Sequence, residues 1–257
     1  MCLIVFAYRV HPEFPLIVAA NRDEFRDRPT RPAEFWPEQP NLVAGRDLSQ
    51  GGTWLGLNRQ GQLAMVTNYR NPKEARGRLS RGLLVSQFLQ QDENSPATYL
   101  ETLGVQADEY SGFNLLTGNA DALYYYSNRG ASSRQPQLLA PGLYGLSNHL
   151  LDTPWPKVER AKAGLHTLIE QSDPDPEALL DLLRDSTPAA DAQLPDTGVG
   201  LDWERLLSPI FIEGQHYGTR SSTILLISRQ GEATFVEQSY DAHGAGTRRD
   251  YRFPILA

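Results

Sequence analysis

The sequence has a single cysteine, and it lies at position 2, directly after Met1. Initiator methionine is generally removed when the next side chain is small, and its removal would leave a thiol and an α-amine on one residue. A free α-amine has a pKa of about 7.7–8.0 and a free thiol about 8.5, so the amine can take the thiol proton near neutral pH. This pattern predicts an N-terminal nucleophile whose own amine is the base. An ordinary buried cysteine on an apolar strand is the alternative interpretation, because free cysteine is among the most buried residue types.

A run of four polar residues, Asn21-Arg22-Asp23-Glu24, directly follows the second apolar stretch of the sequence. The first two apolar stretches should pair as a hairpin, which places this run opposite Cys2. Asp23 could then orient an N-terminal amine, and Arg22 could lower a thiol pKa or hold an anionic group. We expect Asn21 and Arg22 to contact substrate. A solvated loop entrance is the alternative interpretation, and it holds for most charged clusters.

Three further polar residues stand at the ends of apolar stretches. Asn68 and Asn148 each close one, in VTNYRNP and GLSNHLLD. Asparagine at such a position is most often a turn former, but its amide is also a suitable donor to an oxyanion. Arg220, in YGTRSST, precedes an apolar stretch and is a further candidate for substrate binding. Taken singly, each of these signals is weak.

The sequence carries no motif typical of a metal, a haem attachment or a bound phosphate. Its five histidines show no HExxH or other paired spacing, and there is no CxxCH. The glycine-rich run GGTWLG lacks the spacing of a phosphate loop, and a turn leading into a strand explains it. We therefore expect no metal site and no cofactor.

Periodicity indicates which elements must position these residues. Apolar, β-branched or alternating runs predict strands over 2–8, 15–20, 53–58, 62–68, 113–117, 123–127, 143–148, 209–213, 222–228, 232–238 and 251–255. Helical spacing predicts helices over 80–90, 96–103, 155–169 and 176–183. Four prolines predict an extended loop over 26–40, and a run rich in Pro, Asp, Ala and Gly predicts an exposed loop over 186–200.

The order of these elements favours an α+β fold. The strands before and after the helices are linked by short turns, so the sheets should be mainly antiparallel rather than doubly wound and parallel. Two antiparallel sheets covered by helices make a four-layer αββα sandwich. We expect a single domain over residues 1–257, because a chain of this length can bury one large core.

Composition restricts the classes of partner. The net charge is −7, from 24 Lys and Arg against 31 Asp and Glu, and no basic run is present. Nucleic-acid binding needs a concentrated basic surface, so we expect no nucleic-acid partner. No apolar run reaches the roughly 18–20 residues of a transmembrane helix, and the N-terminal stretch lacks the features of a signal peptide. One cysteine cannot form an internal disulfide, so a cytoplasmic location is expected.

Longer motifs resemble one known family along nearly the whole chain. They are MCLIVFAY, LIVAANRDEFRDRPT, GRDLSQGGTWLGLNRQGQLAMVTNYRNP, GLSNHLLDTPWPKVERAK and YGTRSSTILL. By these motifs the sequence is identified as a member of the NRDE-motif family, whose eukaryotic members are called transport and Golgi organisation protein 2. The NRDE tetrad with its RPT continuation and the GGTWLG segment are the most specific parts.

This resemblance implies a relation to the N-terminal-nucleophile hydrolases and to their αββα sandwich. The pattern is similar to choloylglycine hydrolases and penicillin V acylases, which cut amide bonds with an N-terminal cysteine. By the resemblance, Cys2 matches the nucleophile and Asp23 matches the aspartate that contacts its amine. Asn68 matches an asparagine of the oxyanion hole, Asn148 a second asparagine of the site, and Arg220 a site arginine.

The resemblance has one departure and leaves two functions open. In those hydrolases the site arginine precedes the asparagine, whereas here it follows, in Ala20-Asn21-Arg22-Asp23. One expectation is a cysteine-dependent hydrolase of an amide or acyl bond in a small or lipid-like molecule. The other is a non-catalytic protein that binds and moves a hydrophobic ligand such as haem or acyl-CoA in the same pocket, because eukaryotic members are associated with lipid metabolism and haem movement. Similarity of fold does not decide between the two.

Overall fold

The computed structural model of the protein describes residues 2–91, 95–130, 134–171 and 173–256. Its strands form two antiparallel sheets within these ranges. The six-stranded sheet has the order β10 (Gly142–Leu146), β1 (Cys2–Tyr8), β2 (Leu16–Phe25), β11 (Tyr217–Ile227), β12 (Glu232–Asp241) and β13 (Gly244–Pro254). The seven-stranded sheet has the order β3 (Thr30–Trp36), β4 (Gln39–Asp47), β5 (Leu55–Asn58), β6 (Leu63–Asn68), β7 (Phe113–Gly118), β8 (Leu123–Ser127) and β9 (Gln137–Leu138).

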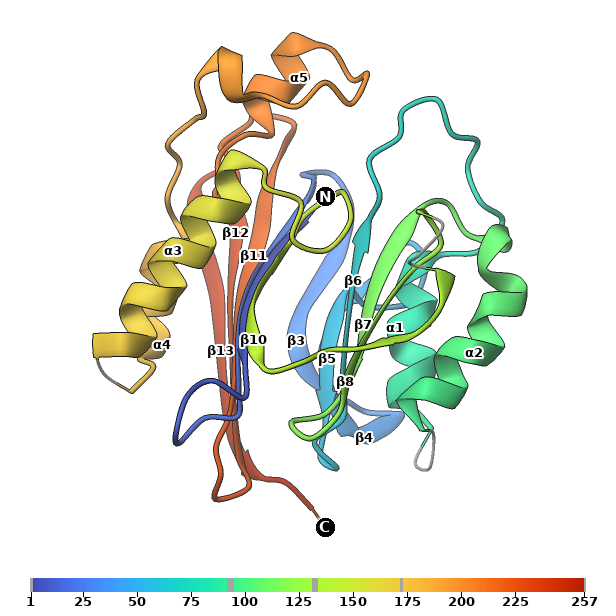
Figure 1. Ribbon diagram of the computed structural model, residues 1–257, viewed down its shortest axis with the longest axis vertical. Coiled ribbons are helices and arrows are strands. Elements are labelled where there is room, and N and C mark those ends of the chain that lie inside the picture. Colours follow the sequence, from blue (N-terminus) through green and yellow to red (C-terminus); the bar gives the residue numbers. More distant parts are fainter. Residues whose placement is uncertain (1, 92–94, 131–133, 172, 257) are drawn as a thin grey trace.

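Helices cover the outer face of each sheet. The five α-helices of the described ranges are α1 (Arg81–Leu89), α2 (Pro96–Gln106), α3 (Pro156–Gln171), α4 (Pro176–Leu183) and α5 (Leu201–Leu206). Figure 1 shows α3 and α4 on one side, α1 and α2 on the other, and the two sheets between them. This arrangement confirms the α+β class and the four-layer αββα sandwich. No helix in the part of the chain that the structure describes is long and apolar enough to cross a bilayer.

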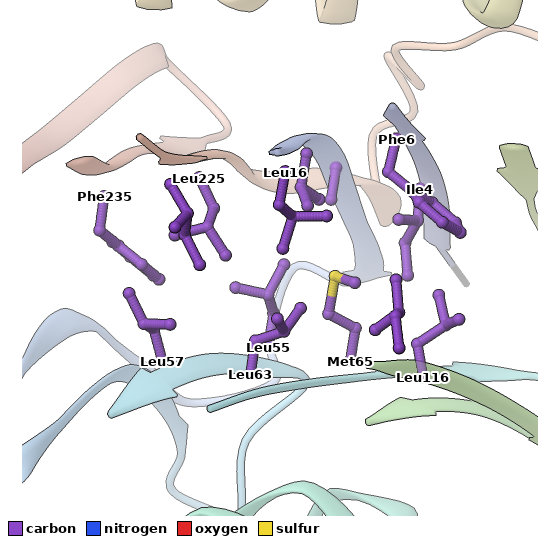
Figure 2. Packing of buried hydrophobic residues seen from close by; sticks show 14 of the residues in the cluster. Ile4, Phe6, Leu16, Leu55, Leu57, Leu63, Met65, Leu116, Leu225 and Phe235 are labelled. Atoms are coloured by element: carbon purple, nitrogen blue, oxygen red, sulfur yellow. The ribbon is translucent and has the colours of Figure 1, made fainter. Parts of the chain in front are cut away.

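The space between the two sheets holds one of the large apolar clusters. Leu225 and Phe235 from the six-stranded sheet meet Leu57, Leu63 and Met65 from the seven-stranded sheet (Figure 2). Successive side chains of a strand point to opposite faces, so every second residue of β1, β2, β11 and β12 enters this layer. Full burial of each such side chain stabilises the fold by about 1.5–3 kcal/mol.

The remaining residues of the inner strands face the helices. Leu3, Val5 and Ile17 pack against Val158 and Leu165 of α3 in a second cluster. A third cluster joins α1 and α2 to the outer face of the seven-stranded sheet. Both faces of β1 and β2 are therefore buried, which explains why their sequences are continuously apolar rather than alternating.

The proline-rich stretch 26–40 is not the extended loop that its composition predicts. It contains β3 and the start of β4. β3 lies at an edge of its sheet. A proline is tolerated there, because its missing N–H can face the unpaired side of the strand. The β3–β4 register also shifts between Arg31 and Glu34, at the position of Pro32. An edge strand with an irregular register can therefore tolerate Pro32, while Pro29 and Pro37 lie outside the strands and Pro40 is the second residue of β4.

A strand predicted over 209–213 is also absent from the structure. The backbone of this segment finds other partners. The Ile212 N–H donates to Thr219 Oγ1 at 2.9 Å, and the Ile210 carbonyl accepts from Asn21 Nδ2 at 2.9 Å. Side chains thus satisfy groups that a strand would pair with a neighbouring strand. The other predicted strands and helices are present, and β11, β12 and β13 are longer than predicted.

The six-stranded sheet ends in a long, solvent-exposed strand. β13 pairs with β12 along one side only, and residues 244–250 are exposed. Its exposed side chains include Arg248, Arg249 and Asp250. The central strands β1, β2 and β11 are instead covered on both sides, and they carry the residues of the candidate site.

Candidate functional site

Cys2 begins β1 at one end of the sandwich and is partly buried. It pairs with Arg22 of β2, as the hairpin prediction requires. Ile4 and Phe6 of β1 lie in the layer between the sheets, so the alternation of the strand points the Cys2 side chain into the same layer. A cavity of about 10 Å³ lies there, lined by Cys2 and by Ile4, Leu55 and Val66. This volume is enough for about one water molecule.

Arg22 lies on the same face and lines the same small cavity. Its guanidinium stacks on the Trp54 ring, 4.3 Å from the ring centre, and only 6% of the residue is exposed. Arg22 Nη1 also approaches Thr30 Oγ1 at 3.4 Å. The Asn21-Arg22-Asp23-Glu24 run is therefore not a solvated loop entrance at this position, because it continues β2 into the buried layer.

Asp23 points to the opposite face of β2, toward the helices. It is 1% exposed, and its Oδ1 accepts a hydrogen bond from Thr219 Oγ1 at 2.7 Å. Burial raises the pKa of the Asp23 carboxyl, whereas the charge of Lys157 and the Thr219 bond lower it. Because Arg22 is the partner of Cys2, Asp23 lies one position beyond the start of β1. The charge of Asp23 nevertheless acts on the Cys2 thiol.

Asn148 and Asn68 meet near Cys2 through a chain of hydrogen bonds. Ser147 Oγ donates to the Cys2 carbonyl at 3.1 Å and lies 3.2 Å from Asn148 Oδ1. Asn148 Nδ2 in turn donates to Asn68 Oδ1 at 2.9 Å. This bond turns the Asn68 carbonyl oxygen toward Asn148 and leaves the Asn68 NH₂ group on the other side of the amide. The structure thus brings two strand ends from different sheets beside Cys2.

The Cys2 thiol is held in its neutral form. Burial raises the pKa of this thiol above its ordinary value, and the negative charge of Asp23 raises it further. Arg22 and a hydrogen bond from the Asp23 backbone amide act in the opposite direction. The thiolate is the nucleophilic form of cysteine. Attack by Cys2 at neutral pH therefore needs a base that removes the thiol proton.

Asn21 lines the Cys2 cavity, and its side-chain amide makes three structural hydrogen bonds. Its Nδ2 donates to the carbonyls of Leu183 and Ile210, each at 2.9 Å, and its Oδ1 accepts from Ser222 Oγ at 2.6 Å. These bonds hold the Asn21 amide at the face of β2 that meets the helices. The substrate contact expected for Asn21 stays a prediction.

Arg220 lies at a register shift of the β2–β11 pair, between Thr219 and Ser221. Its Nη1 donates to the carbonyls of Phe25 at 2.9 Å and Arg28 at 3.1 Å. Arg220 lines a different cavity, to which Cys2 does not contribute. The structure therefore groups Cys2, Arg22, Asp23, Asn68 and Asn148. Asn21 also lines the Cys2 cavity, and Arg220 lies outside the group.

Lys157 is a residue of the site that the sequence analysis does not single out. It is 2% exposed, and its Nζ has no hydrogen-bonding partner among the described residues. Burial lowers the pKa of Lys157 to about 8, against the opposing charges of Asp23 and Cys2. Lys157 stands four residues before Ala161 and eight before Leu165, both buried, so helical spacing places it on the apolar face of α3. A charge on this stripe is the signal that could have identified it.

A buried ion pair supports Asn148 from the other side. Arg70 Nη1 lies 2.6 Å from Glu204 Oε2, and both side chains are at most 4% exposed. The Arg70 backbone N–H donates to the Asn148 carbonyl at 2.7 Å, and its guanidinium lies 4.7 Å from the Trp155 ring centre. Residues 70 and 204 are far apart in sequence, and no local pattern indicates that they meet.

These groups offer acid–base and nucleophilic chemistry. A thiol, a buried carboxyl, a buried amine and two linked amides lie around one strand end. In the described part of the chain, no group of three or more His, Cys, Asp and Glu side chains is arranged to hold a metal ion. The arrangement suits attack by sulfur on a carbonyl carbon with amide stabilisation of the oxygen.

Comparison with known sequences identifies close relatives. The sequence profile of the family described as Transport and Golgi organisation 2 matches residues 1–242. The Transport and Golgi organization protein 2 homolog of Bos taurus is 39% identical over 259 residues, which cover 93% of each chain. This similarity extends over nearly the whole length of both proteins.

Comparison with solved structures finds the same fold in two hydrolases. The C2A mutant of the conjugated bile acid hydrolase from Clostridium perfringens gives a TM-score of 0.53 at 8% identity, covering 100% of this chain and 98% of the other. The Caenorhabditis elegans ortholog of N-acylethanolamine-hydrolyzing acid amidase gives 0.50 at 12% identity, covering 88% and 92%. At such low identity the likeness shows a shared N-terminal-nucleophile hydrolase fold.

Proposed function

The chain belongs to the Transport and Golgi organisation 2 family, and we propose that within this family it acts as a cysteine-dependent amide or acyl hydrolase. Removal of Met1 would place the α-amine on Cys2, beside the Asp23 carboxyl. The substrate is a small or lipid-like molecule that presents a carbonyl to the Cys2 thiol. The Asn68 amide donates to the oxyanion, and Asn148 orients that amide. Arg22 contacts the bound molecule beside the thiol.

The acylation step follows from the protonation state of the site. The α-amine takes the thiol proton while sulfur attacks the carbonyl carbon, and the carbonyl π electrons move onto oxygen. The Asn68 NH₂ group and backbone N–H groups stabilise the resulting oxyanion. The carbon–nitrogen bond then breaks, the leaving nitrogen takes the proton from the amine, and a thioester remains on Cys2.

Deacylation uses the same groups in reverse order. Water attacks the thioester carbonyl, the α-amine accepts a proton from that water, and the thiolate leaves and is reprotonated. Asp23 acts on this cycle as a positioning residue, because its negative charge orients the α-amine. The same charge favours the protonated α-amine, which forms once in acylation and once in deacylation. Burial raises the pKa of the Asp23 carboxyl, and the buried Lys157 ammonium opposes this rise and so favours the charged form.

The convergence of four groups at the start of β1 is the observation that carries the proposal. β pairing sets Arg22 opposite Cys2 with Asp23 one residue further along β2, and Ser147 links the Cys2 carbonyl to the pair Asn148 and Asn68. The neutral resting thiol also supports it, because an N-terminal nucleophile supplies the base that such a thiol needs. By their names, the two hydrolases of the same fold act on N-acylethanolamines and on conjugated bile acids.

The direct test is intact-mass spectrometry of the purified chain with a panel of fluorogenic N-acyl aminomethylcoumarins of increasing acyl length. We expect the Met1-free protein to release aminomethylcoumarin and to gain one acyl mass on Cys2 during turnover. Cys2→Ser should form an acyl ester on the serine hydroxyl and hydrolyse it slowly. Cys2→Ala should gain no mass. Equal release by wild type and Cys2→Ala would refute the proposal.

A second test uses a variant that retains Met1, because an inserted residue between Met1 and Cys2 blocks methionine removal. Without a free α-amine on Cys2, the base is lost, and turnover should fall by at least about a hundredfold. A protein that keeps its full rate with a blocked N-terminus uses a different base, and the N-terminal mechanism is then wrong.

Carriage of a hydrophobic ligand such as haem or acyl-CoA is the alternative for the same pocket. The lining of the Cys2 cavity by Ile4, Leu55 and Val66 suits a hydrocarbon group. Its volume of about 10 Å³ is far below that of haem, so carriage would require the sheets to separate at this end. A titration of haem followed by its absorbance band tests this function, and an unchanged band excludes the haem form.

A further inference from the structure

A second cavity shares one wall with the cavity beside Cys2. It has a volume of about 180 Å³, and Trp54 lines both cavities. Arg220 and Ser221 of β11 and Glu237 and Asp241 of β12 are among the polar residues of its wall. None of the roles proposed above for the Cys2 reaction uses this cavity. It therefore needs an explanation of its own.

The walls of this cavity hold buried polar groups with few partners. Arg220 Nε is buried and has no hydrogen-bonding partner among the described residues. Glu237 is only 1% exposed, and the hydroxyls of Ser221 and Thr223 are the side chains that bond to its carboxyl. Burying polar and charged groups around an empty hollow carries a free-energy cost in the unliganded protein. A ligand with matching groups would remove this cost.

Glu237 is fixed in place by its other oxygen. Its Oε1 accepts a hydrogen bond from the Ala33 N–H of β3 at 2.7 Å, which ties the edge of one sheet to the other. Glu237 stands two residues after Phe235, whose side chain lies between the sheets, so the strand alternation directs the carboxyl into that layer. Oε2 is thus held in the wall of the cavity, where a carboxylate oxygen can accept a further hydrogen bond from a ligand beside those of the neighbouring hydroxyls.

The apolar wall depends on the absence of a side chain at Gly45. A Cβ atom at this position would lie 2.3 Å from Trp54 Cη2 and 3.3 Å from Glu237 Oε2. Because Gly45 leaves this space open, the Trp54 ring can lie against β4 and come close to Glu237. The Arg22 guanidinium stacks on the same ring. The Trp54 ring is therefore held in place by contacts with Gly45 of β4 and with the Arg22 guanidinium.

The charges around the cavity are of both signs. Arg220 lies near Arg22 and Arg26, which together with burial lower the pKa of its guanidinium. Glu237 and Asp241 of β12 supply carboxyl groups on the neighbouring strand. A ligand that carries only one sign of charge would leave the opposite wall uncompensated, whereas a compact dipolar molecule can match both.

We propose that this cavity binds a compact zwitterion with an amine and a carboxylate, such as a small α-amino acid. Its ammonium group donates to Glu237 Oε2, its carboxylate accepts from Arg220 Nε and Ser221 Oγ, and its apolar part packs on Trp54. A benzene-sized molecule fills a cavity of about 150 Å³, so a cavity of about 180 Å³ suits about six to nine non-hydrogen atoms. Binding does not require Cys2 to be a nucleophile.

The test is isothermal titration calorimetry of the full-length protein with L-alanine, L-serine and L-leucine. Propionate lacks the amine and ethylamine lacks the carboxylate, so they are the matched controls for L-alanine. We expect saturable binding of at least one of the amino acids and binding at least about tenfold weaker for both controls. No saturable heat with any of the three amino acids overturns the proposal, as does equal binding of propionate or ethylamine.

Three variants locate the binding site. Glu237→Gln keeps an acceptor for the Ala33 N–H but removes the charge, and it should weaken binding about tenfold or more. Glu232→Gln is the matched control, because Glu232 lies on the same strand and pairs with Arg252 outside the cavity. Cys2→Ala should bind as the wild type does, so binding can be judged even if the hydrolase proposal fails. Unchanged binding by folded Glu237→Gln, checked by circular dichroism, would place the zwitterion elsewhere.

Discussion

Asn148 Nδ2 donates to Asn68 Oδ1 at 2.9 Å, so one asparagine fixes which way the amide of the other points. Asn148 is itself 0% exposed and is held through its backbone carbonyl by the Arg70 N–H at 2.7 Å. The donor group of Asn68 is therefore set before any substrate arrives. Preorganised donors of this kind are worth more than donors that must turn into place.

Replacement of Asn68 should lower the rate of hydrolysis without weakening substrate binding. Asn68→Ala removes the proposed oxyanion donor, and we expect kcat to fall by about 10²–10³ with KM little changed. Steady-state kinetics with the best coumarin substrate measures both constants. Asn41→Ala, at an exposed position of β4, is the control. A fall confined to KM would assign Asn68 to ground-state binding instead.

Asp23→Asn should change the reactivity of Cys2 and the rate of hydrolysis in opposite directions. The charge of Asp23 raises the pKa of the Cys2 thiol, so its removal increases the thiolate fraction at a given pH. We expect alkylation of Cys2 by iodoacetamide at pH 7.5 to become about threefold to tenfold faster. Hydrolysis should become slower, because the amine loses its orienting partner. Asp27→Asn, at an exposed site, should change neither rate.

The buried Lys157 predicts a stability that rises with pH in the alkaline range. Its pKa falls from 10.5 to about 8 on folding, so between these pH values the unfolded chain binds the proton and the folded chain does not. The free energy of unfolding should therefore rise from pH 8 to pH 10.5, by up to about 3 kcal/mol for this group. Urea unfolding of wild type and Lys157→Met measures it. A difference between the two proteins that stays constant over this range would contradict the prediction.

Glu237 predicts the opposite trend at lower pH. Burial raises its pKa from 4.5 to about 7, so between these values the folded chain binds the proton and the unfolded chain does not. The free energy of unfolding should fall as pH rises from 4.5 to 7, by up to about 3 kcal/mol for this group. Comparison of wild type with Glu237→Gln isolates this contribution. Parallel stability curves for the two proteins would show that Glu237 titrates normally.

The layer between the sheets should be sensitive to loss of volume. Leu225 is 0% exposed and packs in the cluster between the sheets, so Leu225→Ala should lower the free energy of unfolding by about 2–5 kcal/mol. Leu138 is 60% exposed, and Leu138→Ala should change it by less than about 0.5 kcal/mol. Chemical denaturation of the three proteins checks the prediction. Equal effects at the two positions would mean that the cluster is not tightly packed.

The sequence predicts the architecture well because hydrophobic periodicity reports local structure. Short turns between apolar runs indicate antiparallel pairing, and the pairing of Cys2 with Arg22 follows directly from that hairpin. The errors lie where context outside the segment decides. Pro32 of the stretch 26–40 is tolerated because β3 is an edge strand, and neighbouring strands cannot be identified from within a segment.

The candidate site is less predictable than the fold, because side-chain direction and long-range partners decide it. The position of Asn21 beside Arg22 suggests a shared role, but strand alternation sends its amide to the helices. Glu237 looks like an ordinary polar residue of an alternating strand until the second sheet covers it. The contact of Arg70 with Glu204 joins residues 134 positions apart, which only the folded chain reveals.

The exposed strand β13 bears on how the molecule behaves in concentrated solution. One side of this strand has unpaired backbone groups, which could accept a strand from a second molecule and start a growing sheet. β13 carries the charged residues Arg248, Arg249 and Asp250. Pairing with the β13 strand of a second molecule would bring these charges close to the same charges of that molecule. Electrostatic and desolvation costs thus oppose edge-to-edge aggregation. Neutralising these side chains should make the protein precipitate more readily.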